Sequence, residues 1–167
     1  AEAQPPVGVQ RIVQGSRPAV APDGTVYVAW VDSTDDRPFE GLAEIYVARS
    51  EDGENFSQPS RAAFFLETGF RPQNAFFRYW GTVFPRIAVG PDGKIFVVYT
   101  GIPADNPDDD GDTFLVGSTD EGRSWSRPSR LNDDETDRLQ FFPEVDVGSD
   151  GVIHVMWGDM RDDGFET

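Results

Sequence analysis

The chain has 167 residues, no cysteine and a formal net charge of −16. The lack of cysteine excludes disulfide bonds, thiolate metal sites and a cysteine nucleophile. The negative charge argues against nucleic acid as a partner, because a phosphate backbone would be repelled. No apolar run approaches the roughly 18 residues of a membrane-spanning helix. The 17 glycines and 13 prolines favour short strands and turns over helices.

A repeat organises the sequence. The segments 17–30, 86–99 and 144–157 align without gaps, and each reads as a strand, an Asp-Gly turn and a second strand that ends on Trp or Tyr. The Asp-Gly pair supplies the positive backbone angle that a two-residue hairpin needs. The second strand is rich in β-branched and aromatic residues and is apolar on both faces, as in the middle of a stacked sheet.

A second pattern follows each of the first two copies. The stretch 118–125 has the form Ser-x-Asp-x-Gly-x-x-Trp, and 49–56 matches it with Glu in place of Asp. Such a turn can stabilise itself, because the carboxylate accepts hydrogen bonds from turn amides and glycine takes the left-handed conformation. The structural residues expected in these turns are Ser118, Asp120, Gly122 and Trp125 in one, and Glu51, Gly53 and Phe56 in the other. With strands on both sides of each turn, the repeat unit has four strands.

Together the two patterns resemble the sialidase-like, Asp-box (BNR) repeat propellers. The resemblance implies an all-β fold, an incomplete β-propeller of four-stranded antiparallel blades, with about two and a half blades of the six that such propellers usually have. A tandem β-sandwich is the alternative. The expected division is an N-terminal segment that could supply the closing strand of the last blade through 7–13, a first blade, an aromatic-rich connection, a second blade and the first half of a third: 1–15, 16–66, 67–83, 84–132 and 133–167.

The resemblance also suggests catalytic candidates. Arg17 matches the position of a substrate-binding arginine on the innermost strand of the first blade, and Asp35 or Asp36 matches the acid/base aspartate in the loop after the second strand. The alternatives are a structural arginine and a solvated acidic loop. The family's other arginines and its Tyr–Glu pair would lie in blades that are not present, so these residues cannot form a complete sialidase site.

One loop is a candidate calcium site. The segment 105–112 is rich in aspartate, and hard oxygen ligands at this density suit Ca²⁺. The expected ligands are Asp105, Asp108, Asp110 and Asp112. A solvated acidic turn is the alternative. The sequence contains no nucleotide, flavin or haem motif.

The connection between the first two blades is rich in aromatic residues and arginine. Such a composition favours a contact surface or sugar stacking, and a buried long connection is the alternative. The candidate binding residues are Phe70, Arg71, Phe76, Phe77, Tyr79 and Trp80.

These observations lead to one functional hypothesis and two alternatives. The chain is expected to be a non-catalytic, exported module for binding or assembly at the cell surface. Export is expected because 1–6 looks like a mature N-terminus left after signal-peptide removal. The alternatives are the N-terminal part of an exo-acting glycosidase such as a sialidase, and a structural subunit of an extracytoplasmic complex. The expected partners are a glycan, and either the rest of the propeller or another subunit over the open end near Val145, Val147, Val152, Val155 and Trp157.

Overall fold

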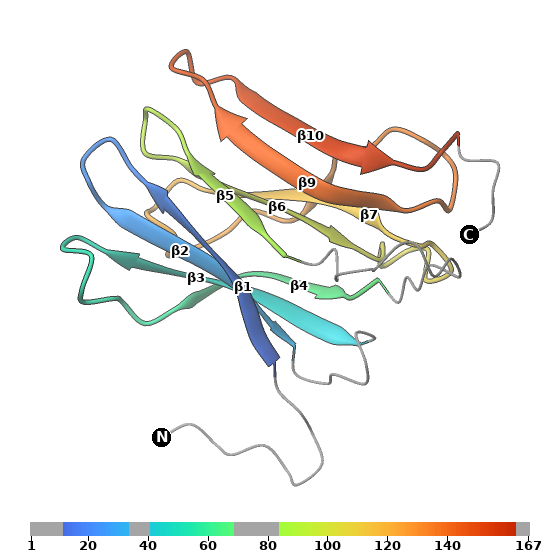
Figure 1. Ribbon diagram of the computed structural model, residues 1–167, viewed down its shortest axis with the longest axis horizontal. Helices are drawn as coiled ribbons and strands as arrows, with labels where there is room; N and C mark the ends of the chain where they lie inside the picture. Colours follow the sequence, from blue (N-terminus) through green and yellow to red (C-terminus); the bar gives the residue numbers. More distant parts are fainter. Residues whose placement is uncertain (1–11, 34–40, 69–83, 163–167) are drawn as a thin grey trace, which may run out of the picture.

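A computed structural model describes residues 12–33, 41–68 and 84–162 (Figure 1). This part of the chain contains ten β-strands and no helix, so none of it is a helix that could cross a membrane. The predicted all-β class and the four-stranded antiparallel sheets are confirmed. The strands are β1 (Ile12–Val20), β2 (Val26–Ser33), β3 (Leu42–Ser50), β4 (Ser60–Leu66), β5 (Arg86–Val89), β6 (Ile95–Gly101), β7 (Asp112–Ser118), β8 (Ser129–Arg130), β9 (Gln140–Val147) and β10 (Ile153–Asp159).

The strands form three stacked sheets in chain order. Two sheets have four strands, β1-β2-β3-β4 and β5-β6-β7-β8, and β9 and β10 form a pair. Strand β5 contacts β1 on one side and β9 on the other, so the first strands of the three sheets are neighbours (Figure 1). The described sheets do not close into a ring, and the number of blades in a complete propeller therefore stays a prediction.

The main core lies between the first two sheets. Tyr99 of β6 is 1% exposed, and its ring centroid is 4.9 Å from that of Phe65 and 5.7 Å from that of Phe114. Alternate residues of both sheets fill the rest of this layer, as expected when two β-sheets pack face to face. They include Ala29, Val31, Ala43, Ile45, Val47, Ile87, Ile95, Val97 and Val116.

The three Asp-Gly pairs lie at hairpin tips, as predicted, but the loops have three residues instead of two. In the first loop, Ala21 N–H donates to the Thr25 carbonyl (2.8 Å) and Gly24 N–H to the Ala21 carbonyl (2.9 Å). Only the glycine of each loop has a positive φ. This is a β-turn followed by a left-handed residue, a common three-residue hairpin. The proline or serine before Asp takes the first central position of the turn, so the loops are 22–24, 91–93 and 149–151.

The expected apolar surface on the third repeat is placed differently. Val145 and Val155 face each other in register, and Val147 lies against Gly90 of the second sheet. Val145, Val147, Val155 and Trp157 are half-buried, whereas Val152 is 49% exposed. The opposite, open face of the β9–β10 pair presents Glu144, Asp146, His154 and Met156. A partner on this face would meet mainly polar groups.

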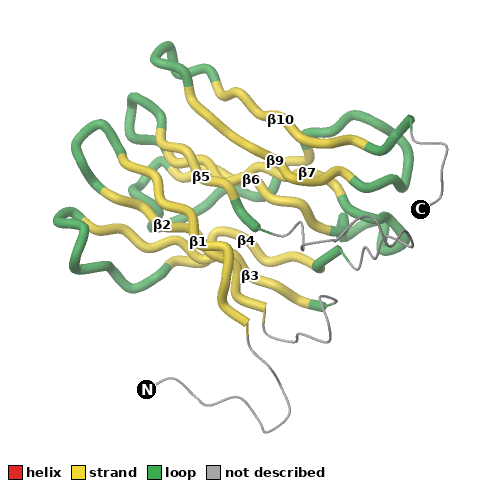
Figure 2. Tube along the Cα trace, viewed as in Figure 1, coloured by secondary structure: helices red, strands yellow, loops and turns green. Residues whose placement is uncertain are grey.

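The two ends of the stack differ in their loops (Figure 2). At one end, which we call the turn end, lie the Asp-Gly hairpins and the two Asp-box turns. The opposite end, which we call the loop end, carries the longer connections 102–111 and 131–139 and the residues after β10. Within the expected closing strand 7–13, Ile12 and Val13 belong to β1 and pair with Ser33 and Asp32. The other residues of that segment lie outside the described residues.

Candidate functional site

The Asp-box turns at the turn end are closed by their own side chains. In the second box, Ser118 Oγ donates to Asp120 Oδ1 (2.9 Å) and accepts from Gly122 N–H (2.9 Å). Asp120 Oδ1 also accepts from Ser124 N–H (2.8 Å). Hydrogen bonds from Ser124 lower the pKa of Asp120 to about 2, because they stabilise the charged form.

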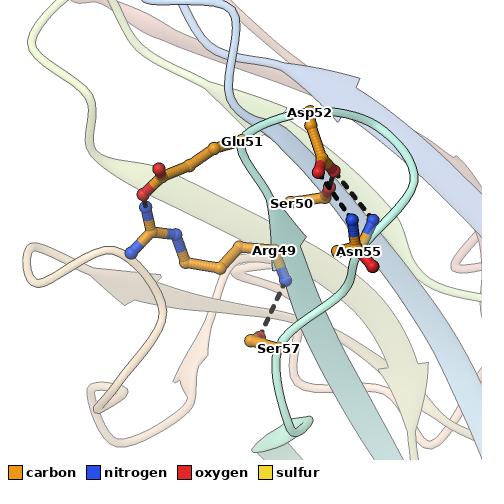
Figure 3. A pocket seen from close by; sticks show the side chains of 6 residues that line it. All are labelled: Arg49, Ser50, Glu51, Asp52, Asn55 and Ser57. Atoms are coloured by element: carbon orange, nitrogen blue, oxygen red, sulfur yellow. Dashed lines mark hydrogen bonds and ion pairs between the residues drawn. The ribbon is translucent and has the colours of Figure 1, made fainter.

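The first box has the same geometry but is one residue shorter (Figure 3). Asp52 Oδ1 accepts from Ser50 Oγ (2.9 Å) and from the N–H of Asn55 (2.7 Å). In the ladder, Ser50 faces Val26 just as Ser118 faces Ile95. The carboxylate that corresponds to Asp120 is therefore Asp52, and the expected role of Glu51 is corrected. The sequence alignment fixed the glycine and the aromatic residue and so misplaced the serine.

This register gives a direct test. Asp52→Ala is expected to lower the melting temperature, because it removes the acceptor for the turn amides. Glu51→Ala is the matched control, since Glu51 is exposed and its recorded contact is an ion pair with Arg49. Thermal denaturation followed by circular dichroism would measure both. An equal loss in the two variants would contradict the assignment of Asp52.

The second Asp box also joins the two four-stranded sheets. Trp125 Nε1 donates to Ser60 Oγ (3.0 Å), Ser60 Oγ donates to the Gly122 carbonyl, and Arg49 forms an ion pair with Glu121 (2.7 Å). A shallow pocket of about 320 Å³ at the first box is lined by polar groups that mostly bond to one another. The boxes are thus structural turns.

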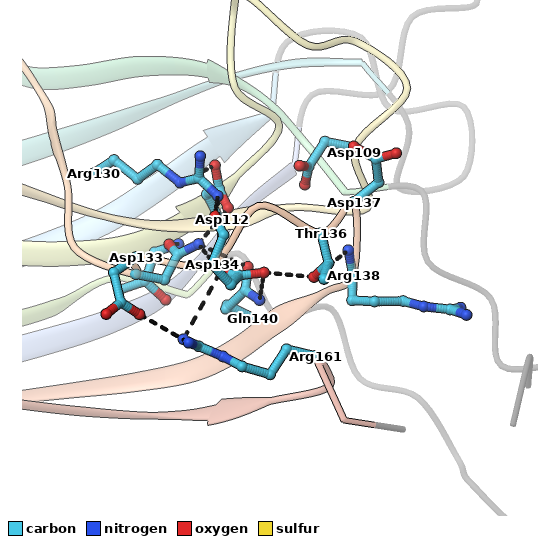
Figure 4. A network of polar contacts seen from close by, with 12 residues as sticks. Asp109, Asp112, Arg130, Asp133, Asp134, Thr136, Asp137, Arg138, Gln140 and Arg161 are labelled. Carbon is cyan, nitrogen blue, oxygen red and sulfur yellow. Dashed lines mark hydrogen bonds and ion pairs between the residues drawn. The ribbon is translucent and has the colours of Figure 1, made fainter. Parts of the chain in front are cut away.

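The loop end holds a denser polar cluster, which we call the loop-end network (Figure 4). Asn132 is at its centre. Its two Nδ2–H groups are shared among Asp112 Oδ1 (2.6 Å), Asp134 Oδ1 (2.8 Å) and Gln140 Oε1 (3.1 Å), and its Oδ1 accepts from Thr113 N–H (3.0 Å). The network joins the edge of the second sheet to β9 and β10. Its members are Asp112, Arg130, Asn132, Asp133, Asp134, Gln140, Asp159 and Arg161.

Two arginines compensate the carboxylates of this network. Arg130 Nε lies 2.8 Å from Asp112 Oδ2, and Arg161 pairs with both Asp133 (2.8 Å) and Asp159 (2.7 Å). Because a buried charge is costly unless it is paired and hydrogen-bonded, these contacts explain how carboxylates can be retained here. These ion pairs hold the connection between the second and third sheets in place.

The carboxyl groups of the network titrate differently. Burial raises the pKa of Asp112, and the hydrogen bond from Asn132 and the charge of Arg130 oppose that shift only in part. Burial also acts to raise the pKa of Asp134, but hydrogen bonds from Thr136 and Asn132 outweigh it and leave this pKa below its usual value. Hydrogen bonding from Arg161 lowers the pKa of Asp159 to about 2. Asp134 and Asp159 are therefore charged at neutral pH, and Asp159 in this form pairs with Arg161.

The structure separates the expected calcium ligands. Asp105, Asp108 and Asp110 are exposed, whereas Asp112 is fully buried in the loop-end network. Within the described ranges, no group of three or more His, Cys, Asp or Glu lies close enough to hold a metal ion. Calcium binding by 105–112 stays a prediction, which calorimetric titration with Ca²⁺ would test.

The other predicted site residues are only partly described. Arg17 is exposed on β1, opposite Ala29 in the ladder. Arg86, its counterpart in the second sheet, forms an ion pair with Glu144 of β9, which is a structural role. The acid candidates and the aromatic binding candidates lie outside the described residues: Asp35, Asp36, Phe70, Arg71, Phe76, Phe77, Tyr79 and Trp80.

The central residues of the loop-end network were not predicted. The sequence shows 132–137 only as another acidic run. A usable signal was the pair of amides, Asn132 and Gln140, on either side of charged residues, since buried amides often satisfy several polar groups at once.

No protein-family model matches this sequence, and no curated protein is similar enough to count as a relative. Solved structures do share the fold. A protein of unknown function from Dyadobacter fermentans aligns with a TM-score of 0.58 at 14% identity, and the Hadza microbial sialidase Hz136 aligns with 0.54 at 17%. A thermostable family-43 glycoside hydrolase aligns with 0.50 at 16%. These alignments cover 86%, 84% and 87% of the present chain.

The similarity is one of fold. The chain spans 45%, 31% and 48% of the lengths of these three proteins, so it corresponds to less than half of each. The chain shares with them an all-β architecture that contains antiparallel four-stranded sheets, and these neighbours are propeller-like. At these identities, a common function does not follow from it.

Proposed function

We propose that this chain is a non-catalytic, carbohydrate-binding module of a sialidase-like propeller, exported from the cell. The observation that carries the proposal is the loop-end network. It occupies the end with the long connections, yet its carboxylates are engaged with Asn132, Arg130 and Arg161. Carboxylates held in this way stabilise the connection and have little freedom to bind and act on a substrate.

Assembly at the open end is part of the same proposal. Strands β2 and β6 each have a partner on both sides, whereas β10 has only β9 among the described strands. An unpaired strand edge readily accepts another strand. We therefore expect the rest of a propeller or another subunit to pair with β10. The open face next to that edge is mainly polar, with Met156 exposed on it.

One observation favours an enzyme as the second candidate. Asp109 in the 102–111 connection is 5% exposed, and its Oδ1 accepts from Gly111 N–H (2.7 Å). Burial raises its pKa to about 6, which is the range in which a carboxyl group can serve as a general acid near neutral pH. Under this alternative the chain is the N-terminal part of a glycoside hydrolase, as the folds of the sialidase and the family-43 hydrolase suggest.

A hydrolysis assay separates the two candidates. The 167-residue chain is expected to release no fluorophore from a fluorogenic sialoside above background, because transition-state stabilisation needs several charged groups placed together. Release that Arg17→Ala or Asp109→Asn abolishes would support the enzyme. Retained binding of an oligosaccharide without hydrolysis is the result that the binding-module proposal requires.

A further inference from the structure

The chain contains six Asp-Gly dipeptides, and five of them lie in the described residues. Aspartate before glycine readily forms a succinimide, because glycine has no side chain to hinder the attack of its backbone nitrogen on the preceding carboxyl group. The succinimide takes up water and yields isoaspartate, in which the side-chain carbon has entered the backbone. The five described dipeptides are 23–24, 52–53, 92–93, 110–111 and 150–151.

Four of these dipeptides hold the glycine nitrogen against a neutral acceptor. Gly24, Gly93 and Gly151 donate their N–H groups to backbone carbonyls of their own hairpin loops, at 2.9, 3.0 and 2.9 Å. Gly53 N–H donates to Ser50 Oγ (2.9 Å). A carbonyl or hydroxyl oxygen does not take up a proton near neutral pH, so these acceptors do not activate the nitrogen.

The carboxyl groups of the same four aspartates are also held. Asp23, Asp92 and Asp150 each accept a hydrogen bond from the N–H two residues later, at 2.9, 3.2 and 3.1 Å. Asp52 Oδ1 accepts from Asn55 N–H (2.7 Å). Hydrogen bonds from backbone amides stabilise a carboxylate in its charged form. The charged form is a poor electrophile, because its oxygen can leave as water only after it is protonated.

The dipeptide Asp110-Gly111 differs in both respects. Gly111 N–H donates to Asp109 Oδ1 (2.7 Å), so its acceptor is a carboxyl group, which can take the proton. Asp110 is exposed, and within the described ranges its own carboxyl group makes no hydrogen bond. A basic group within hydrogen-bond reach of the proton that it removes has the geometry of a general base.

We propose that Asp110 is a modification site, which the protein itself converts to isoaspartate with Asp109 as the general base. Asp109 removes the proton from Gly111 N while this nitrogen forms a bond to Asp110 Cγ. A Cγ–O bond then breaks, and the oxygen leaves as water with the proton of the Asp110 carboxyl group and the proton that Asp109 returns. One water molecule then breaks the bond between Asp110 C and Gly111 N, so the conversion changes no atom count and needs no other reagent.

The conversion would alter the contact between the two long connections of the loop end. Asp110 N–H donates to the Asp137 carbonyl (3.1 Å), and the Gly111 carbonyl accepts from Gln140 N–H (2.8 Å). Isoaspartate places an additional carbon in the backbone between these two hydrogen bonds, so both cannot keep their present geometry. All of these groups lie in the described loops, and their arrangement does not depend on what covers the open faces of the stack.

The experiment follows isoaspartate in the purified 167-residue chain during incubation at neutral pH. Peptide mapping with electron-transfer fragmentation distinguishes isoaspartate from aspartate, and the other four dipeptides are controls within the same molecule. Asp110 is expected to convert at least about tenfold faster than any of them, since general-base catalysis typically contributes that much or more. Asp109→Asn should lower the rate at Asp110 to that of the other four, because the amide oxygen can keep the hydrogen bond from Gly111 N–H but takes no proton.

Asp108→Asn is the matched control, because it makes the same substitution at the exposed neighbour and leaves Asp109 in place; its rate at Asp110 should equal that of wild type. The measure is the ratio of rates within one molecule, since an unfolded variant would raise all five rates together. Equal conversion at the five dipeptides, or none at Asp110, would overturn the inference. Faster conversion at Asp110 that persists in Asp109→Asn would overturn it as well, because exposure alone would then explain the site.

Discussion

Replacing Asn132 by alanine is expected to destabilise the fold by about 3 to 5 kcal/mol, the usual cost of leaving buried charged groups without their partner. Asn132 is only 5% exposed. It bonds to the side chains of Asp112, Asp134 and Gln140 and to the backbone of Thr113. Alanine would leave these buried groups short of a hydrogen-bond partner. Urea denaturation at pH 7 would measure the loss.

Asn106→Ala is the control for this substitution. Asn106 Nδ2 also donates to a carboxylate, Asp137 Oδ1 (2.7 Å), but that contact is exposed. Its removal should change the free energy of unfolding by no more than about 0.5 kcal/mol. If Asn132→Ala cost less than about 1 kcal/mol, water or a rearranged side chain would be able to replace the amide. The loop-end network would then not be what holds the second and third sheets together.

The second large effect is expected at Asp109 and depends on pH. Burial raises the pKa of this carboxyl group from 3.8 to about 6, so the folded state favours its protonated form. The contribution to stability is therefore fully present below about pH 4 and is lost as the pH rises through 6. Two pKa units correspond to up to about 3 kcal/mol. Asp109→Asn should match wild type near pH 4 and be more stable by up to that amount at pH 8.

Asparagine is a suitable replacement because its Oδ1 can keep the hydrogen bond from Gly111 N–H. Asp108→Asn serves as the control, since it replaces the exposed neighbour in the same loop by the same amide and leaves the buried carboxyl group in place. The measurement is urea denaturation at intervals between pH 4 and pH 8. A stability difference for Asp109→Asn that is the same at every pH would show that the buried carboxyl group does not titrate near 6.

Much of the architecture could be predicted from the sequence because it rests on local rules. The alternation of apolar residues fixes which side of a strand is buried, and the Asp-Gly pairs mark where the chain reverses. These signals placed the hairpins at 23–24, 92–93 and 150–151 and gave four strands per unit. The errors were also local. Asp-Gly alone does not specify a two- or three-residue loop, and the shorter first Asp box shifted its carboxylate from Glu51 to Asp52.

By itself, the sequence determined the β class, the repeat, the turns and the absence of cysteine chemistry, since each depends on residues close together in the chain. Only the tertiary structure decided how Asn132 gathers Asp112 and Gln140, because these groups come from different sheets and meet only when the sheets stack. It likewise decided the pairing of Arg161, which follows β10, with Asp133 in the connection before β9.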